Sequence, residues 1–180
     1  MPSPAFERRS QPAGDKLPES LFIPAPLPLP GLTFRLLQSA DIDPLHAACY
    51  ADRPFHTFRE SCRRALTRLS QGRCYPLVAV HNGELVGHAQ LVIYPNVAEI
   101  ANLAVAPAWQ GQGIGTALIT ALTQIARHTR HSFLEIGVHE SNQRALALYQ
   151  RLGFTISREI KLPPKGEKGI ILEKLLPEQL

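Results

Sequence analysis

The chain has 180 residues, of which 44% are hydrophobic and 19% charged, and its net charge is +4. This size and balance indicate one globular domain with a sizeable core, not a fibrous or largely disordered chain. No apolar run reaches the roughly 18 residues that a membrane span requires, and the basic residues are too scattered to indicate a nucleic-acid partner. We therefore expect a cytoplasmic protein with no membrane and no nucleic acid among its partners.

Residues 1–30 differ in composition from the rest, since they hold half of the 16 prolines. Alternating prolines between Pro24 and Pro30 interrupt the short apolar stretch at 21–23, which is not typical of a signal peptide. We expect an extended or disordered arm over 1–30 and a single domain over 31–180.

The three cysteines, Cys49, Cys62 and Cys74, are widely spaced and odd in number. Such a set fits neither a disulfide framework nor a metal site. We expect reduced thiols and no bound metal.

Hydrophobic periodicity and turn residues from residue 31 onward predict a regular series of elements. The series is strand 32–36, helix 39–51 with Ser39 as N-cap, helix 55–70, strands 77–80, 85–93 and 98–106, helix 111–131, strand 133–138, helix 142–152, and strands 153–160 and 169–176. The turn Asn82-Gly83 is a strong hairpin signal, because a tight turn there needs positive φ. The order βααβββαβαββ indicates a mixed α/β domain.

A glycine-rich turn between strand 98–106 and the next helix is the most informative segment. It reads Gln110-Gly111-Gln112-Gly113-Ile114-Gly115-Thr116. Such a turn can direct several backbone N–H groups and the positive end of a helix at one anion. Its spacing matches neither the P-loop nor the dinucleotide-binding G-x-G-x-x-G pattern.

This turn resembles the Q/R-x-x-G-x-G/A signature of the GNAT N-acetyltransferase superfamily. The segment from Asn142 to Phe154 is similar to a second signature of that family, N-x-x-A-x-x-L-Y-x-x-x-G-F. The resemblance implies a GNAT-like acyl-CoA N-acyltransferase fold over residues 31–176, in which the fourth and fifth strands are parallel and splay apart. It implies acetyl transfer from acetyl-CoA to an amine by direct attack, and family members often form homodimers.

The resemblance also implies how acetyl-CoA binds. Backbone N–H groups of Gly111, Gln112, Gly113, Ile114, Gly115 and Thr116 would hold the pyrophosphate, and the Gln110 side chain would support their loop. Leu103, Ala104 and Val105 belong to a bulged fourth strand whose backbone would pair with the pantetheine arm. Asn142 would bond the pantetheine or cap the helix that follows it.

Tyr149 is the residue that the second signature marks for chemistry. When an amine attacks a thioester, the sulfur leaves as a thiolate, and a nearby phenol can protonate it. The family commonly uses a tyrosine here as general acid. The alternative is a core aromatic, since Tyr149 shares an apolar stripe with Ala145 and Leu152.

Two glutamates are candidates for the general base that deprotonates the amine. Glu135 interrupts the apolar strand 133–138, and burial there would raise its pKa toward a useful value. It also matches the glutamate of the ribosomal-protein N-terminal acetyltransferase branch. Glu99 begins the preceding strand, where some family members place a base that acts through water. Either glutamate could instead be structural.

The acceptor is expected to be a small-molecule or peptide amine. By position in the family, its pocket would use Arg53, Phe55, His56 and Phe58, with Tyr94 and the loop 163–166. His88 and His139 read as satisfied structural histidines. The sequence departs from the ribosomal-protein branch, because Gly137 stands where that branch has Arg and residues 159–163 lack its Tyr-Tyr pair.

Two alternatives to acetyl transfer stay open at the level of sequence. The chain could be a non-catalytic acyl-CoA-binding module with an intact phosphate cradle, or an acyltransferase that uses another short-chain acyl-CoA.

Overall fold

A computed structural model describes residues 17–18, 26–162 and 166–177. Its elements run in the order β1 (Leu32–Leu36), η2 (Ser39–Asp41), α1 (Ile42–Cys49), α2 (Phe55–Leu69), β2 (Cys74–His81), β3 (Glu84–Ile93), β4 (Ala98–Val105), η3 (Pro107–Trp109), α3 (Ile114–His128), β5 (Phe133–His139), α4 (Gln143–Arg151), β6 (Thr155–Leu162) and β7 (Glu167–Leu175). None of the helices in these ranges is long and apolar enough to cross a membrane.

The strands form one mixed sheet in the order β1-β2-β3-β4-β5-β7-β6. Antiparallel pairing holds throughout, except that β4 and β5 are parallel. The β2–β3 hairpin turns at Asn82 and Gly83, whose φ angles of 48° and 89° explain the choice of residues. The predicted fold class and the predicted order of helices and strands along the chain are confirmed.

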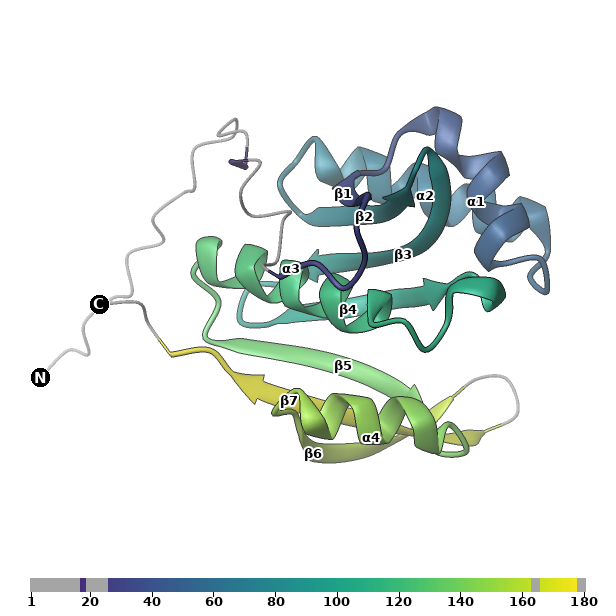
Figure 1. The fold of residues 1–180 in the computed structure, drawn as a ribbon. Helices are drawn as coiled ribbons and strands as arrows, with labels where there is room; N and C mark the ends of the chain where they lie inside the picture. Colours follow the sequence, from purple (N-terminus) through teal and green to yellow (C-terminus); the bar gives the residue numbers. More distant parts are fainter. Residues whose placement is uncertain (1–16, 19–25, 163–165, 178–180) are drawn as a thin grey trace, which may run out of the picture.

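The sheet is covered by helices on both faces (Figure 1). Neighbouring β2 residues divide between the two sides because side chains alternate along a strand. Leu77 joins the large core beneath α3, whereas Val78 joins a smaller core with α1 and α2. Since both faces are buried, the central strands are apolar along most of their length.

Two predicted helix starts are wrong. Gln38, not Ser39, caps η2, in a reciprocal box with Asp41 that ties the turn to the end of β1. The helix predicted over 111–131 begins only at Ile114, because Gly111 and Gly113 have φ angles of 79° and 84°. Left-handed backbone cannot continue a right-handed helix, so the glycines form a separate loop.

The β4–β5 pair splays apart after three paired positions. The parallel register joins Ala98 to Leu134, Glu99 to Glu135 and Ile100 to Ile136, and no pairs follow. Both strands continue beyond this point, and Figure 1 shows them diverging toward their carboxyl ends. The splay that the family resemblance implied is therefore present.

A bulge in β4 lies where the splay begins. His88 of β3 pairs with Ala104 and Gln90 with Ala101, so Asn102 and Leu103 together face one β3 residue. Asn102 takes a φ of 53°, which asparagine tolerates better than most residues. The bulge changes the direction of the strand at the edge that faces β5.

Most of the predicted arm over 1–30 lies outside the described residues. The described Leu17, Leu27 and Leu29 pack against the large core. Pro28 approaches the glycine loop so closely that a Cβ on Gly113 would stand 2.9 Å from its Cβ.

Candidate functional site

A cleft occupies the splay and has a cavity volume of about 400 Å³. Four of the predicted catalytic and cofactor-binding residues line it, namely Glu99, Leu103, Asn142 and Tyr149. They come from β4, from the loop before α4 and from α4 itself. The fold therefore brings two residues of the second signature together with the strand that precedes the first, although these segments lie far apart in the sequence.

The glycine loop forms a cradle between the end of β4 and the first turn of α3. Gln110 donates from Nε2 to the carbonyl of Val105 at 3.1 Å, which ties the loop to the strand. The first N–H groups of α3, from Ile114 onward, have no carbonyl one turn earlier in the helix to bond. Together with the helix dipole they form a site suited to a phosphate.

Arg144 adds a positive charge beside this cradle that the sequence analysis did not single out. Its Nη2 lies 3.7 Å from the position that a Cβ would take on Gly111. The residue is one of the unspecified positions of the second signature, and only the packing of α4 beside the loop reveals its role.

The edge of β4 that faces the cleft is open. Among the described strands, nothing pairs with this edge after Ile100, so Leu103, Ala104 and Val105 offer backbone groups to a ligand. An extended molecule could bond here as an added strand would. Asn142 caps α4 by accepting from the N–H of Ala145 at 3.1 Å while it lines the cleft.

A buried network holds the β4 bulge from behind. The Tyr50 hydroxyl lies 2.5 Å from the carbonyl oxygen of Asn102 and 2.7 Å from Nδ1 of His88. A carbonyl only accepts, so the phenol donates to it, and His88 Nδ1 must carry a proton that it donates to the phenol oxygen. The network therefore fixes both the bulge and the histidine tautomer.

The same reasoning leaves Nε2 of His88 as an unprotonated acceptor. It is buried and has no partner within the described part of the chain. Burial lowers the pKa of His88 to about 4, so the ring is neutral at neutral pH. The expectation of a satisfied histidine is wrong for this atom, whereas His139 bonds Ser141 and Glu167 through its two nitrogens.

Tyr149 is buried on α4 with its ring 6.3 Å from that of Phe154. It belongs to the large core and also lines the cleft, so the two sequence readings are not exclusive. Its hydroxyl has no hydrogen-bond partner among the described residues. Burial raises the pKa of Tyr149, which keeps the phenol protonated at neutral pH.

Glu135 does not have the properties that the sequence predicted. Arg158 of β6 binds both its oxygens, at 2.9 and 3.0 Å, and the same guanidinium reaches Glu173 at 3.2 Å. Hydrogen bonding from Arg158 lowers the pKa of Glu135, and this outweighs partial burial, which acts to raise it. The expectation of a raised pKa is wrong, and Glu135 does not line the cleft.

Glu99 lies beside Glu135 in register, and its charge also raises the pKa of Arg158, but it has a further neighbour. It lines the cleft, and its neighbour is the phenol of Tyr94. Burial raises the pKa of Tyr94, and the charge and hydrogen bonding of Glu99 raise it further. Of the two candidate bases, only Glu99 has access to the cleft.

The predicted acceptor residues are only partly brought together. Arg53 and Phe58 line a second cavity that adjoins the cleft, whereas Phe55 and His56 line neither. Residues 163–165 of the predicted loop lie outside the described residues. Lys168, next to this loop, is paired with Glu140 and Glu159.

Trp109 lies immediately before the glycine loop. Its ring packs against His81 with centroids 4.5 Å apart, and it borders the large core. The indole therefore anchors the stretch between the end of β4 and the cradle.

Comparison with known proteins agrees with this geometry. The profile of the Acetyltransferase (GNAT) family matches residues 39–154. The chain belongs to this family, and it is an acyltransferase of the N-acetyltransferase type.

Particular relatives can then be named. The [ribosomal protein bS18]-alanine N-acetyltransferase of Escherichia coli is 29% identical over 143 residues, which are 77% of this chain and 95% of that protein. A GNAT family acetyltransferase from Elizabethkingia anophelis, solved with acetyl-CoA bound, has a TM-score of 0.64 and 25% identity and covers 82% of this chain and all of its own. The spore coat polysaccharide biosynthesis protein SpsD of Bacillus subtilis is 33% identical over 79 residues, 44% of this chain, and the chain spans only 27% of it.

Proposed function

We propose that the protein transfers an acetyl group from acetyl-CoA to a primary amine, with both substrates bound together and no covalent enzyme intermediate. The observation that carries this proposal is the cleft. It combines an open strand edge with a protonated phenol, and the glycine cradle follows directly after the strand that carries this edge.

The residues present fit acetyl-CoA. The first N–H groups of α3 and the Arg144 guanidinium suit the pyrophosphate, and the open β4 edge suits the amide groups of the pantetheine arm. A related structure, from Elizabethkingia anophelis, is described with acetyl-CoA bound, which supports the same donor here.

The proposed chemistry needs one acid and one base. The amine lone pair attacks the thioester carbonyl carbon, the carbon–sulfur bond breaks, and the electron pair leaves with sulfur. Tyr149 gives its proton to the thiolate, since a protonated phenol lines the cleft on the α4 side. Glu99 removes a proton from the incoming ammonium, directly or through a water molecule.

Glu99 is preferred to Glu135 as the base because of their partners. A carboxylate held by both nitrogens of one guanidinium is a weaker base and cannot turn toward the cleft without breaking that pair. We therefore assign Glu135 a structural role, joining β5 to β6 through Arg158.

The test is mass spectrometry of a mixed amine panel incubated with the protein and acetyl-CoA. The panel contains peptides with different first residues, lysine peptides, polyamines, aminoglycosides and amino acids. Peptides that begin with alanine are included because the Escherichia coli relative is named for that residue of bS18. An acetyl mass on one class supports the proposal. Tight acetyl-CoA binding with no acetylated product would favour a binding module, and preference for propionyl- or succinyl-CoA would correct the donor.

A further inference from the structure

A second cavity adjoins the cleft beneath α2 and has a volume of about 160 Å³. It shares Arg53 and Asn102 with the cleft, so a molecule that reaches the thioester can extend into it. Polar side chains from α2 and β3, among them Ser61 and Gln90, contribute to its lining. The volume is suited to a small polar group, not to a second cofactor.

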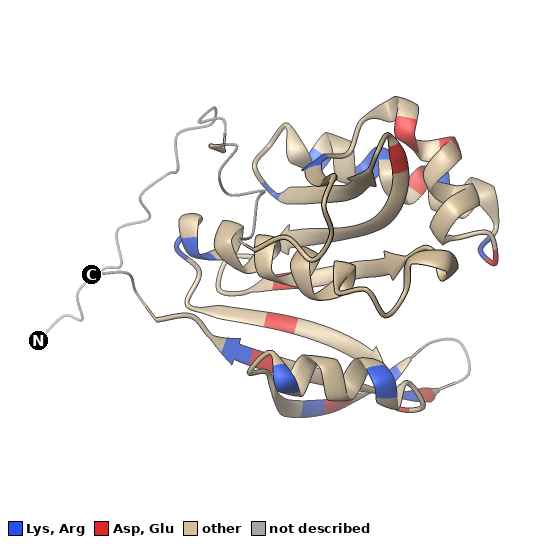
Figure 2. Cartoon of the chain, in the orientation of Figure 1, with Lys and Arg blue, Asp and Glu red and all other residues tan. Residues whose placement is uncertain are grey.

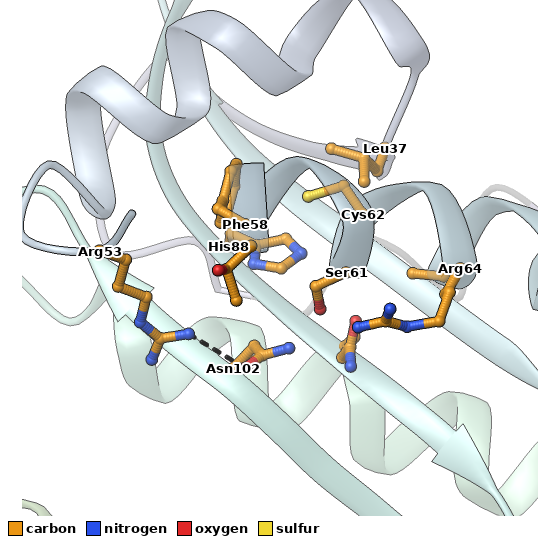
Figure 3. Close-up of a pocket in the computed structure, with 11 residues that line it drawn as sticks. Leu37, Arg53, Phe58, Ser61, Cys62, Arg64, His88 and Asn102 are labelled. Atoms are coloured by element: carbon orange, nitrogen blue, oxygen red, sulfur yellow. Dashed lines mark hydrogen bonds between the residues drawn. The ribbon is translucent and has the colours of Figure 1, made fainter. Parts of the chain in front are cut away.

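Two guanidinium groups border this cavity without strong partners. Within the described residues, the Arg53 guanidinium reaches only the side-chain oxygen of Asn102, at 3.5 Å, besides stacking on the Tyr50 ring. Nη1 of Arg64 lies 3.8 Å from Oε1 of Glu60, and both side chains are 62% exposed. Figure 3 shows Arg53 and Arg64 extending toward the hollow from opposite sides. None of the described residues that line the cavity is acidic, so these cations retain unused donors.

His88, on the inner wall of the cavity, favours a hydrogen-bond donor in a ligand, not an anion. Nε2 is a buried acceptor without a partner, and the imidazole lines the cavity. A buried acceptor without a hydrogen bond is unfavourable, and a ligand N–H or O–H would offset this cost. The cavity is therefore suited to a ligand with an anionic group at the border of the cavity and a hydrogen-bond donor beside His88.

Helix α2 extends the positive charge outward. It carries four arginines, at positions 59, 63, 64 and 68, against one acidic residue, Glu60, a net charge of +3. Figure 2 shows these basic positions repeated along α2. Such a surface attracts anionic substrates toward the adjoining cavity.

We infer, resting on the proposed acetyl transfer, that the acceptor is a primary amine that carries a side-chain carboxylate. The amine lies in the cleft, the carboxylate binds between Arg53 and Arg64, and a neighbouring N–H of the substrate donates to His88 Nε2. An acidic peptide N-terminus, with Asp or Glu in its first two positions, supplies all three groups. A free acidic amino acid supplies the same amine and carboxylate.

The experiment compares acceptors that differ only in charge. Peptides of constant sequence carry Asp or Asn, and Glu or Gln, at the first or second position, and free glutamate is compared with glutamine. We expect kcat/KM to be about tenfold or more higher for the charged member of the preferred pair, as a desolvated charge-assisted bond would give. A preference confined to peptides identifies a peptide N-terminus, and one confined to glutamate identifies a free amino acid.

Arg64→Gln and Arg63→Gln form a matched pair of variants at exposed positions of α2. Both remove one positive charge, but only Arg64 lines the cavity. Arg64→Gln should raise KM for the acidic acceptor about tenfold, and it should raise KM for the amide acceptor much less. Arg63→Gln should leave the KM of both acceptors nearly unchanged, and added salt should remove any small remaining effect.

Two different results would overturn the inference, and they are distinguishable. Acetyl transfer with equal efficiency to charged and amide acceptors, or equal effects of the two variants, would refute the acidic acceptor while the proposed reaction stands. Failure to acetylate any amine of either panel would refute the proposed reaction, and the inference with it.

Discussion

The two walls of the cleft are built on different physical principles. The β4 wall, residues 99–105, presents mainly backbone groups, and a buried neutral network of Tyr50 and His88 holds its bulge. The β5 wall, formed by β5, β6 and β7, is fixed from outside by ion pairs such as Arg158 with Glu135. Charged residues are correspondingly frequent along α4, β6 and β7 (Figure 2).

This difference predicts that the two walls respond differently to substitution. Buried neutral hydrogen bonds are not screened by salt or titrated near neutral pH, so the β4 wall keeps its shape under varying conditions. Exposed ion pairs contribute little and depend on salt and pH. We therefore expect substitutions behind the β4 wall to affect ligand binding, and substitutions in the ion pairs of the β5 wall to affect stability slightly.

The largest expected effect concerns Tyr149, which lines the cleft from α4. Tyr149→Phe should lower kcat about 10²- to 10⁴-fold, the usual contribution of a general acid, with acetyl-CoA affinity unchanged. Because burial raises the pKa of Tyr149, the wild-type rate should not fall with deprotonation of this group until pH exceeds about 10. Steady-state kinetics and calorimetry measure the change in kcat and the affinity for acetyl-CoA.

Tyr75→Phe is the control for this test, because Tyr75 lies outside both cavities. Full turnover of Tyr149→Phe would exclude the role of Tyr149 as general acid.

A second test contrasts the two glutamates that face each other in register. Glu99→Gln should lower kcat about 10²-fold at pH 7, because the bound ammonium loses its base, and the defect should shrink near pH 10, where the amine is already free. Glu135→Gln should leave kcat close to the wild-type value. The pH profiles of both variants decide the assignment, and a reversed pattern would identify Glu135 as the base.

Tyr50→Phe tests the network behind the β4 wall. It removes the donor to the Asn102 carbonyl and the acceptor of the His88 Nδ1 proton, so both become unsatisfied in a buried site. The free energy of unfolding should fall by about 1–3 kcal/mol, and acetyl-CoA should bind more weakly as the bulge relaxes. Urea unfolding and calorimetry measure the two effects. Unchanged affinity would show that the bulge holds without the phenol.

The smallest effect is expected from Glu135→Gln on stability. Its pair with the half-exposed Arg158 should contribute only about 0.2–1 kcal/mol. Since the pKa of Glu135 is lowered in the folded state, this contribution is present above the unfolded pKa and is lost as pH falls through the folded pKa. Unfolding curves of wild type and variant should therefore converge below about pH 4. A constant difference across pH would contradict the assignment.

Local signals in the sequence were sufficient for most of the fold. Asn82-Gly83 requires a turn geometry that few other residues adopt, and the alternation of β2 and β3 follows from burial on both faces. The start of α3 was misplaced because three closely spaced glycines are compatible with a helix start as well as a loop. Only their φ angles distinguish the two.

The site was harder to predict where its properties depend on distant partners. The pKa of Glu135 follows from Arg158, which lies 23 residues later on a strand whose register the sequence does not reveal. The tautomer of His88 likewise depends on Tyr50 and on a backbone carbonyl of a bulge. Motif positions located the cleft, but charge states and hydrogen-bond partners required the three-dimensional packing.

The position of Trp109 has a practical consequence for spectroscopy. It is the only tryptophan in the chain, and it lies immediately before the glycine loop, against His81. Intrinsic emission excited at the indole band therefore reports on this one location. Occupation of the cradle should alter the emission of the unlabelled protein, so that association and release of a nucleotide can be followed by stopped-flow fluorescence without any attached dye.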